Sequence, residues 1–413
     1  MTRYLTAAIE QALWSILNLG VNLLLLRVAT PDQYGTFAFW ANVGFVFVSL
    51  QNALTVTHLS VLPPGDDLHE DRLPTERIMH GVTGIFLILT ACGVLGATLF
   101  LKGAGQELGA PMAALFVPAF LMQQYFRFLS FSRGRPNEAL AQTLAVLVSA
   151  VLLLVVGSMT TGSLTADHIL GLLGLSYGAV GLVAGVLAVR RQGLSFSPSV
   201  LSGFHGFLKP TGWLFLGVTS SELLTRFYAF AVAGAFGASA LASLSATQLL
   251  LRPIPLLATS WSQVARVDLI RRKESRQWRA FSWMVVTALI GGLIASAIWS
   301  GAIDLTWPWL SQLAFKGKYL EDRWMVMLWG VSAALSLVQV VINTPLQVLQ
   351  DYRALAIANA VASVVSAAGI LIGMRMIGPG GAIIGTSIGQ LVEVLIMGGL
   401  LVTAIRSAQN QGR

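Results

Sequence analysis

Three arginines of this 413-residue chain lie inside long apolar segments rather than at their ends: Arg127, Arg226 and Arg252. A guanidinium stays charged near neutral pH, and its planar fork of N–H donors matches the oxygens of a phosphate group. A charge at bilayer depth costs about 2.5–3.5 kcal/mol, so such side chains face a polar interior in preference to lipid. We therefore predict that these arginines bind an anionic, phosphate-bearing ligand.

Each arginine also has a purely structural interpretation, which the sequence leaves open. Glu222 lies four residues before Arg226 and could neutralise it on the same helical face. Arg127 lies within about two turns of a segment end and could extend its side chain to the membrane interface. Arg252 comes directly before Pro253, and proline predicts a kink there.

Three carboxylates are candidates for coupling to an ion. Glu222 and Glu393 are central in their segments, where a carboxylate that binds and releases a proton could couple ligand movement to a gradient. Glu10 lies near the inner end of the first segment, at the mouth of an interior cavity or at the interface. The alternative for each is a paired structural charge.

Neutral polar residues recur at helical spacing along two segments. Asn18 and Asn22 continue a stripe with Gln11 and Ser15, and Gln248 belongs to a second stripe in the eighth segment. We predict that Asn18, Asn22 and Gln248 contact the polar part of the ligand. The alternative is that they join helices through hydrogen bonds, worth roughly 0.6 kcal/mol each in membranes.

The elements that position these residues are membrane-spanning helices. The chain is 55% apolar and only 11% charged, against about a quarter charged in soluble domains. About 20 apolar residues cross a bilayer as a helix, which satisfies its own backbone hydrogen bonds. We predict an all-α, polytopic fold with about twelve crossings, at residues 8–27, 35–62, 78–102, 111–132, 138–159, 167–190, 210–232, 239–265, 279–301, 323–347, 354–376 and 381–405.

The net charge of +8 gives the orientation of the helices. Of the 26 lysines and arginines, 17 lie on the side of the N-terminus, six on the other side and three within crossings. The positive-inside rule then places both termini in the cytoplasm, and no nucleic-acid partner is expected. The three longest connections are predicted at 63–77, 266–278 and 302–322.

The crossings divide into two predicted six-helix bundles, residues 1–200 and 201–413. The second helix of each half begins with a similar stretch, residues 31–38 in the first half and 238–245 in the second. The fifth helix of each half also begins with a similar stretch, at residues 139–146 and 354–361. Such echoes are typical of transporters built from duplicated halves.

The sequence also resembles a known family. Residues 26–38 (LRVATPDQYGTFA) resemble the first-loop signature of bacterial polysaccharide flippases of the O-antigen type, in the multidrug/oligosaccharidyl-lipid/polysaccharide exporter superfamily. Residues 378–386 (GPGGAIIGT) are similar to the entry of that family's twelfth helix. The resemblance covers essentially the whole chain and implies the two-bundle exporter fold.

The resemblance implies a flippase that moves a polyprenyl-pyrophosphate-linked oligosaccharide from the inner to the outer leaflet by alternating access, for cell-surface polysaccharide export. Its implied location is the bacterial cytoplasmic membrane. Its implied partners are that glycolipid, membrane lipids and a coupling proton or sodium ion, and a glycan polymerase or assembly complex is left open. The arginines would hold the pyrophosphate.

Two other functions are weighed against the flippase. A multidrug or cation antiporter of the same superfamily needs a cavity dominated by acids. A membrane-embedded glycosyltransferase or polymerase needs catalytic carboxylates or histidines, and residues 302–322 offer only Asp304, Glu321 and Asp322.

No nucleotide loop, metal-ligand spacing or cofactor motif occurs, so we expect no enzyme, no catalytic residue, no metal and no cofactor. Two G-x-S-x-G strings, at 174–178 and 385–389, are interpreted as helix-packing faces.

Overall fold

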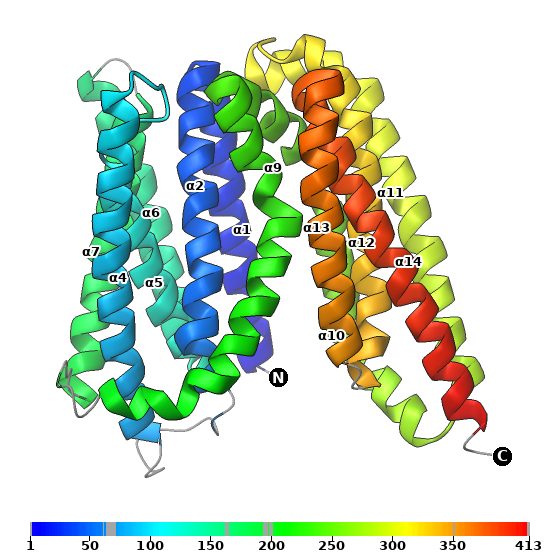
Figure 1. The fold of residues 1–413 in the computed structure, drawn as a ribbon. Coiled ribbons are helices and arrows are strands. Elements are labelled where there is room, and N and C mark those ends of the chain that lie inside the picture. The colour runs from blue at the N-terminus through cyan, green and yellow to red at the C-terminus, as the bar shows by residue number, and fades with distance from the viewer. Residues whose placement is uncertain are drawn as a thin grey trace. The chain divides into compact units, whose positions relative to one another are not determined.

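The structure is a computed structural model that describes residues 2–60, 62, 72–161, 165–192, 197, 201–349 and 352–410. Every regular element in these ranges is helical (Figure 1). The all-α fold class predicted from composition and apolar run length is therefore confirmed.

The helices follow one another with short connections. The first group comprises α1 (Thr2–Val28), α2 (Pro31–Gln51), a π-helical turn (Asn52–Val56), α3 (Thr57–Ser60), α4 (Arg72–Gly103), α5 (Ala113–Ser132), α6 (Pro136–Thr161) and α7 (Ala166–Gln192). The second comprises a 3-10 turn (Gly203–Phe207), α9 (Leu208–Leu249), α10 (Pro253–Glu274), α11 (Trp278–Phe315), a 3-10 turn (Leu320–Asp322), α12 (Arg323–Val348), α13 (Tyr352–Ile377), a 3-10 turn (Gly378–Gly380) and α14 (Gly381–Asn410).

Nine continuous segments of the described chain are long and apolar enough to cross a membrane. Two of them, Thr211–Leu249 and Leu355–Ser407, each contain a break, at Gly237 and at Gly378–Gly380 respectively. Helix α5 (20 residues) is long enough for a further crossing, whereas α10 is more polar and follows the broken segment that ends at Leu249. The nine segments, the two breaks and α5 together agree with about twelve crossings, and the chain is a multi-pass membrane protein.

The chain divides into two compact units. Unit 1 is Met1–Thr219 with Gly237–Ala242, and unit 2 is Ser220–Phe236 with Ser243–Arg413. The predicted halves, 1–200 and 201–413, concern an internal duplication, which these units do not test and which stays a prediction.

A close backbone contact explains why a short piece of α9 belongs to unit 1. A Cβ added to Gly35 would lie 1.8 Å from the carbonyl oxygen of Ala238, so only glycine fits there. The Ser239 hydroxyl also hydrogen-bonds the Asp32 carboxylate. Gly237 begins this piece with φ 83°, a left-handed conformation that interrupts the helix.

In unit 1, α5 is the central helix and packs against α2, α4, α6 and α7. Its Phe116 and Phe120 stack 5.8 Å apart, and Tyr177 of α7 meets Phe120 edge-on at 5.2 Å. The small residue Gly174 lets α7 approach, because a Cβ there would lie 3.0 Å from the Phe116 nitrogen. The predicted packing role of the first G-x-S-x-G string is confirmed.

In unit 2, α14 packs against α13 and α12. The α13–α14 contact uses glycines on both helices: a Cβ on Gly381 would lie 2.0 Å from the Gly373 carbonyl oxygen. On Gly389 it would lie 2.4 Å from the Ser366 Cβ. The second string is therefore a packing face too, as expected for small residues in membrane helices.

We expect Gly385→Ala to destabilise unit 2, because its new Cβ would lie 2.1 Å from the Ile370 nitrogen, a backbone atom that cannot rotate away. Overpacking of this kind costs about 1–3 kcal/mol. Gly398→Ala is the matched control on the same helix, where a Cβ meets nothing within 4 Å. Thermal unfolding in detergent should show a lower midpoint for Gly385→Ala only; equal midpoints would contradict the packing account.

The three predicted long connections are shorter than expected, because helices continue into them. Helix α10 runs to Glu274, so most of the basic stretch 266–278 is helical. Helix α4 begins at Arg72, inside the predicted loop 63–77, and Glu76 is buried there between two arginines. Residues 63–71 lie outside the described ranges.

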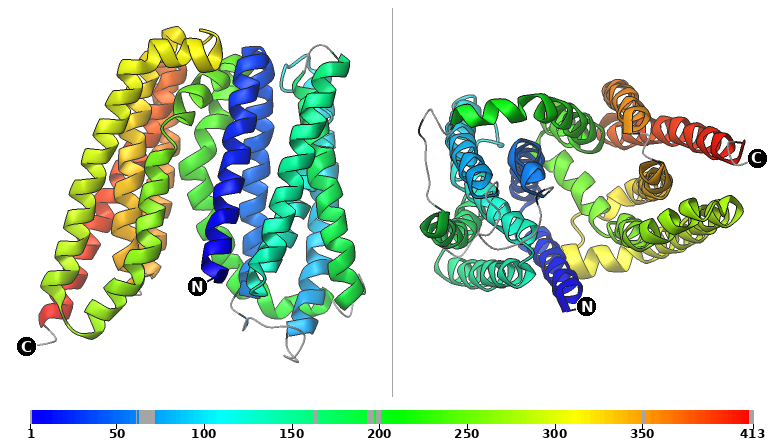
Figure 2. Two further views of the ribbon diagram at one scale, coloured as in Figure 1. Left: turned by 180° about the vertical axis from the view of Figure 1, so that it is seen from behind. Right: turned by 90° about the horizontal axis from the view of Figure 1, so that it is seen from below.

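The prediction of a loop over 302–322 is wrong for its first two thirds. Helix α11 continues through Pro308 to Phe315 and ends where Lys316 takes a left-handed φ of 54°. Its last turns are anchored by Trp307, which is buried and donates from Nε1 to the Tyr319 carbonyl at 3.1 Å. Figure 2 shows these turns, in yellow, at an angle to the rest of α11.

Candidate functional site

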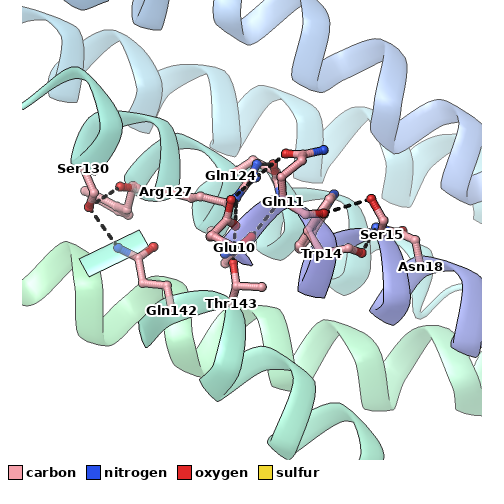
Figure 3. Close-up of polar contacts among 12 residues, drawn as sticks. Glu10, Gln11, Trp14, Ser15, Asn18, Gln124, Arg127, Ser130, Gln142 and Thr143 are labelled. Atoms are coloured by element: carbon pink, nitrogen blue, oxygen red, sulfur yellow. Dashed lines mark hydrogen bonds and ion pairs between the residues drawn. The ribbon is translucent and has the colours of Figure 1, made fainter. Parts of the chain in front are cut away.

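A buried ion pair joins α1 to α5 inside unit 1 (Figure 3). Glu10 is fully buried and Arg127 is 4% exposed. The guanidinium binds both carboxylate oxygens, with Nε–Oε1 at 2.6 Å and Nη2–Oε2 at 2.8 Å. This two-pronged geometry is the strongest form of a charge-assisted hydrogen bond.

Further groups complete the coordination of this pair. Thr143 of α6 donates to Glu10 Oε1 at 2.5 Å. Gln124 and Gln11 each accept a hydrogen bond from Arg127 at 3.2 Å. The guanidinium carbon lies 5.0 Å from the ring centre of Trp14, a cation–π distance. Three helices are thus tied together by one pair of charges.

The prediction treated Arg127 and Glu10 as separate candidates, for ligand and ion respectively, and the structure makes them partners. Because Arg127 is buried on Glu10, the alternative that it extends to the interface is wrong. The two residues are 117 positions apart, so no local spacing could pair them. Their roles in binding stay predictions, and a ligand at Arg127 would have to displace Glu10.

The two asparagines of α1 are half-buried, and their amides hydrogen-bond to their own helix. Asn18 Nδ2 donates to the Trp14 carbonyl at 3.0 Å, and Asn22 Nδ2 to the Asn18 carbonyl at 2.7 Å. Asn22 Oδ1 also accepts from the Tyr34 hydroxyl of α2 at 2.9 Å. This last bond supports the helix-joining interpretation of Asn22, and a ligand contact for either residue stays a prediction.

In unit 2, the predicted Glu222–Arg226 pair is present on α9. Arg226 Nε lies 2.8 Å from Glu222 Oε2, and the side chains are 30% and 16% exposed respectively. The spacing of four residues therefore predicted this pair correctly. Pairing accounts for the charge of both residues without excluding a ligand, because the arginine is only half-buried.

Arg252 lies in the break between α9 and α10, at the cap position that precedes Pro253. The predicted kink at this proline is confirmed, since α9 ends at Leu249. The side chain is exposed. Within the described residues, no carboxylate lies at ion-pair distance from its guanidinium. Arg252 differs in this respect from Arg127 and Arg226.

Gln248 belongs to a hydrogen bond that bridges the Gly237 break. The Tyr228 hydroxyl donates to Gln248 Oε1 at 2.9 Å, and the Tyr228 ring meets Trp329 of α12 edge-on at 5.0 Å. Sequence reasoning missed Tyr228, because a buried tyrosine inside an apolar run has the pattern of a packing residue.

Glu393 is 4% exposed on α14, and its partner is an amide of α12, Gln339. One turn earlier, Gln390 accepts from Ser332 at 2.9 Å and donates to Ser336 at 2.8 Å. In the described part of the chain no basic side chain forms an ion pair with Glu393. Gln339, which sequence reasoning missed, supplies a donor that suits either a carboxylate or a carboxylic acid.

The acids considered for catalysis form no cluster. Asp304 is bound by Arg323 through two hydrogen bonds, at 3.1 and 2.8 Å. Among the described residues, no group of three or more His, Cys, Asp or Glu side chains could hold a metal ion. The polar groups described above are ion pairs and hydrogen-bonded amides on membrane helices.

Comparison with known proteins gives matches in structure. No protein-family model and no curated protein matches the chain. A multidrug resistance MATE transporter of the MOP superfamily, inward-facing, matches with a TM-score of 0.77 at 12% identity over 98% of this chain and 100% of that one. The lipid II flippase MurJ, inward closed, matches with a TM-score of 0.72 at 16% identity over 98% and 89%. A eukaryotic MATE transporter matches with a TM-score of 0.61. The chain therefore has the fold of MOP-superfamily transporters.

Proposed function

We propose that the chain is a membrane flippase for a polyprenyl-pyrophosphate-linked oligosaccharide, working by alternating access. The observation that carries the proposal is Arg252, an exposed guanidinium at a helix break with no carboxylate partner among the described residues. The matched structures include both a lipid II flippase and multidrug transporters. The substrate must therefore be argued from the chain's own charges.

The position of Arg252 favours an anionic substrate. In the sequence, Arg252 lies between Ala238, which follows the break in α9, and Glu274, the last residue of α10. It is well away from the basic last turn of α10. Arginine cannot shed its charge by losing a proton. In the predicted crossing 239–265, an exposed charged side chain needs water or an anion beside it, because hydrocarbon offers neither. A diphosphate supplies a partner of opposite charge and matching geometry.

Among the described residues, no carboxylate forms an ion pair with Arg252. Arg127 is neutralised by Glu10, and Arg226 lies beside Glu222. In this proposal Arg252 grips the pyrophosphate and Arg226 assists. The sugars contact polar groups such as Gln248, and the polyprenyl tail stays in the bilayer. The proposed setting is a bacterial cytoplasmic membrane with both termini cytoplasmic.

Complementation tests the proposed function. The full chain is expressed in bacterial strains that lack their own polysaccharide flippase, and surface glycan is measured. Restored glycan in at least one strain supports the proposal. Correctly inserted protein that restores none, while it exports organic cations from drug-sensitive cells, would support the antiporter instead.

The antiporter is the second candidate because of Glu393. Glu393 is a buried carboxyl whose partner within the described chain is an amide. When it binds or releases a proton, no paired cation there loses its counter-charge. The same group also serves a proton-coupled flippase. We propose it as the coupling residue in either case.

We expect Glu393→Gln to abolish the dependence of transport on a proton gradient, because the amide keeps the shape and loses the titratable proton. Downhill translocation should remain, since Gln339 can still hydrogen-bond the new side chain. Asp304→Asn is the matched control, because its carboxylate is committed to Arg323. Transport is measured in liposomes with and without an imposed pH gradient. Unchanged gradient dependence in Glu393→Gln would assign coupling elsewhere.

A further inference from the structure

The turn between α9 and α10 is held together without a regular helical ladder. In a continuous helix each carbonyl accepts from the N–H four residues later, and proline has no N–H to give. Pro253 and Pro255 therefore leave the carbonyls of Leu249 and Leu251 without their helical donors. Both carbonyls are satisfied from within the turn, because nearby N–H groups donate three residues back instead of four.

The carbonyl of Leu250 loses its helical donor in this rearrangement. That donor would be the Ile254 N–H, which instead donates to the Leu251 carbonyl at 3.1 Å. Trp299 of α11 supplies a replacement, because its Nε1 donates to the Leu250 carbonyl at 2.9 Å. In membrane helices broken by proline, neighbouring helices satisfy the freed backbone groups in this way. Trp299 therefore fixes the turn from outside.

A second hydrogen bond fixes the end of α9 that leads into the turn. The Tyr228 hydroxyl donates to Gln248 Oε1 at 2.9 Å, and Gln248 lies four residues before Arg252. Tyr228 is itself 5% exposed and packed on Trp329. Its hydroxyl is also near enough to Arg226 and Arg252 for both charges to act on it. The second bond is therefore close to the proposed anion-binding group.

The turn presents Arg252 on one side. Leu249 and Leu251 are each 1% exposed, whereas Arg252 is exposed. Among the described residues no carboxylate forms an ion pair with Arg252, and its side chain makes no cap hydrogen bond. The backbone of the turn therefore determines where the guanidinium lies. A group already held in its binding position loses less conformational freedom when the ligand arrives, which strengthens binding.

We propose that Trp299 and Tyr228 are positioning residues for Arg252, and that their hydrogen bonds hold the turn so that the guanidinium meets the pyrophosphate of the substrate. This inference rests on the proposed function, which assigns Arg252 to the pyrophosphate. Neither Trp299 nor Tyr228 touches the ligand. Each acts through the turn, so the loss of either hydrogen bond weakens binding only while Arg252 is present.

Equilibrium binding of farnesyl pyrophosphate to the full-length protein in detergent tests this, with farnesol as the uncharged reference. The probe carries the pyrophosphate and no sugar, so contacts between sugars and Gln248 do not enter the measurement. Trp299→Phe keeps an aromatic ring and loses the N–H, and should weaken pyrophosphate binding about two- to tenfold, the worth of one hydrogen bond. Tyr228→Phe should have an effect of the same size. Farnesol binding should not change.

The matched control is Trp283→Phe on the same helix α11, whose side chain is 65% exposed and which should bind as the wild type does. In an Arg252→Ala background, Trp299→Phe and Tyr228→Phe should cause no further loss, because the group that they position is gone. A general loss of structure would weaken farnesol binding too and would persist without Arg252. If Trp299→Phe fails to fold, Tyr228→Phe makes the same test.

The outcomes distinguish this inference from the proposed function. If neither substitution weakens pyrophosphate binding, or if the loss is equal with and without Arg252, the positioning role is overturned while the pyrophosphate site stands. If the wild type binds farnesyl pyrophosphate no more tightly than farnesol, the pyrophosphate site itself is wrong, and the positioning role falls with it.

Discussion

Replacing Arg127 with alanine is expected to lower the free energy of unfolding by about 3–5 kcal/mol, because Glu10 would be left as a buried, unpaired carboxylate. Thr143 can supply little of the lost interaction, since it is already bonded to Glu10. Gln11 can supply little either, since its oxygen accepts from Arg127. Glu10→Ala leaves a guanidinium in the same position and should be as harmful. Unfolding in detergent, followed by thermal or denaturant titration, measures both.

The controls distinguish a buried pair from charge in general. Arg135 and Glu138 form an ion pair in the same unit with side chains 26% and 40% exposed, and exposed pairs contribute about 0–1 kcal/mol. Arg135→Ala should therefore be nearly neutral. The double variant Glu10→Leu/Arg127→Met removes both charges and should recover much of the loss. If Arg127→Ala were no more harmful than Arg135→Ala, the pair would not hold α1 to α5.

Arg252→Ala is expected to reduce flippase activity by roughly 10- to 100-fold, the worth of a charged hydrogen bond of about 1.5–3 kcal/mol. The side chain is exposed and caps a helix without a side-chain bond, so little change in stability is expected. Activity should fall at equal protein levels. Surface glycan in a complemented flippase-null strain, normalised to membrane protein, is the measurement.

Two substitutions test whether the guanidinium itself matters. Arg252→Lys keeps the charge and loses the planar fork, so we expect partial activity. Arg266→Ala removes a basic side chain from helix α10, which Arg252 precedes. Arg266 donates to Gln347 at 2.7 Å, and its loss should leave activity near wild type. Full activity of Arg252→Ala would remove the proposed pyrophosphate grip.

The helices were predictable because an apolar run long enough to cross the bilayer must form a helix there to satisfy its backbone hydrogen bonds. The break before α10 was predictable from Pro253, because proline lacks the N–H that a helix interior needs and kinks or breaks the helix there. The end of α11 was not, because it depends on contacts made only after the chain folds: Trp307 packs on Phe315 and hydrogen-bonds the Tyr319 carbonyl, and Phe315 packs on Tyr319.

The candidate site divides in the same way. The Glu222–Arg226 pair is local, and a spacing of four residues predicted it. The Glu10–Arg127 pair and the Gln339–Glu393 hydrogen bond join residues far apart in sequence, and many polar residues could have been matched to each. Helical periodicity gives the face of a side chain. It does not give its partner on another helix.

Lipid translocation by the purified chain is a direct test of a flippase that depends on the pyrophosphate. The full chain is reconstituted into liposomes with a fluorescent polyprenyl-pyrophosphate-linked oligosaccharide, and loss of fluorescence on quenching of the outer leaflet reports movement between leaflets. We expect acceleration for this lipid, none for a polyprenyl glycoside without the pyrophosphate, and a rate near that of empty liposomes for Arg252→Ala. Equal rates with the chain and without it, or equal rates for the charged and uncharged lipids, would contradict it.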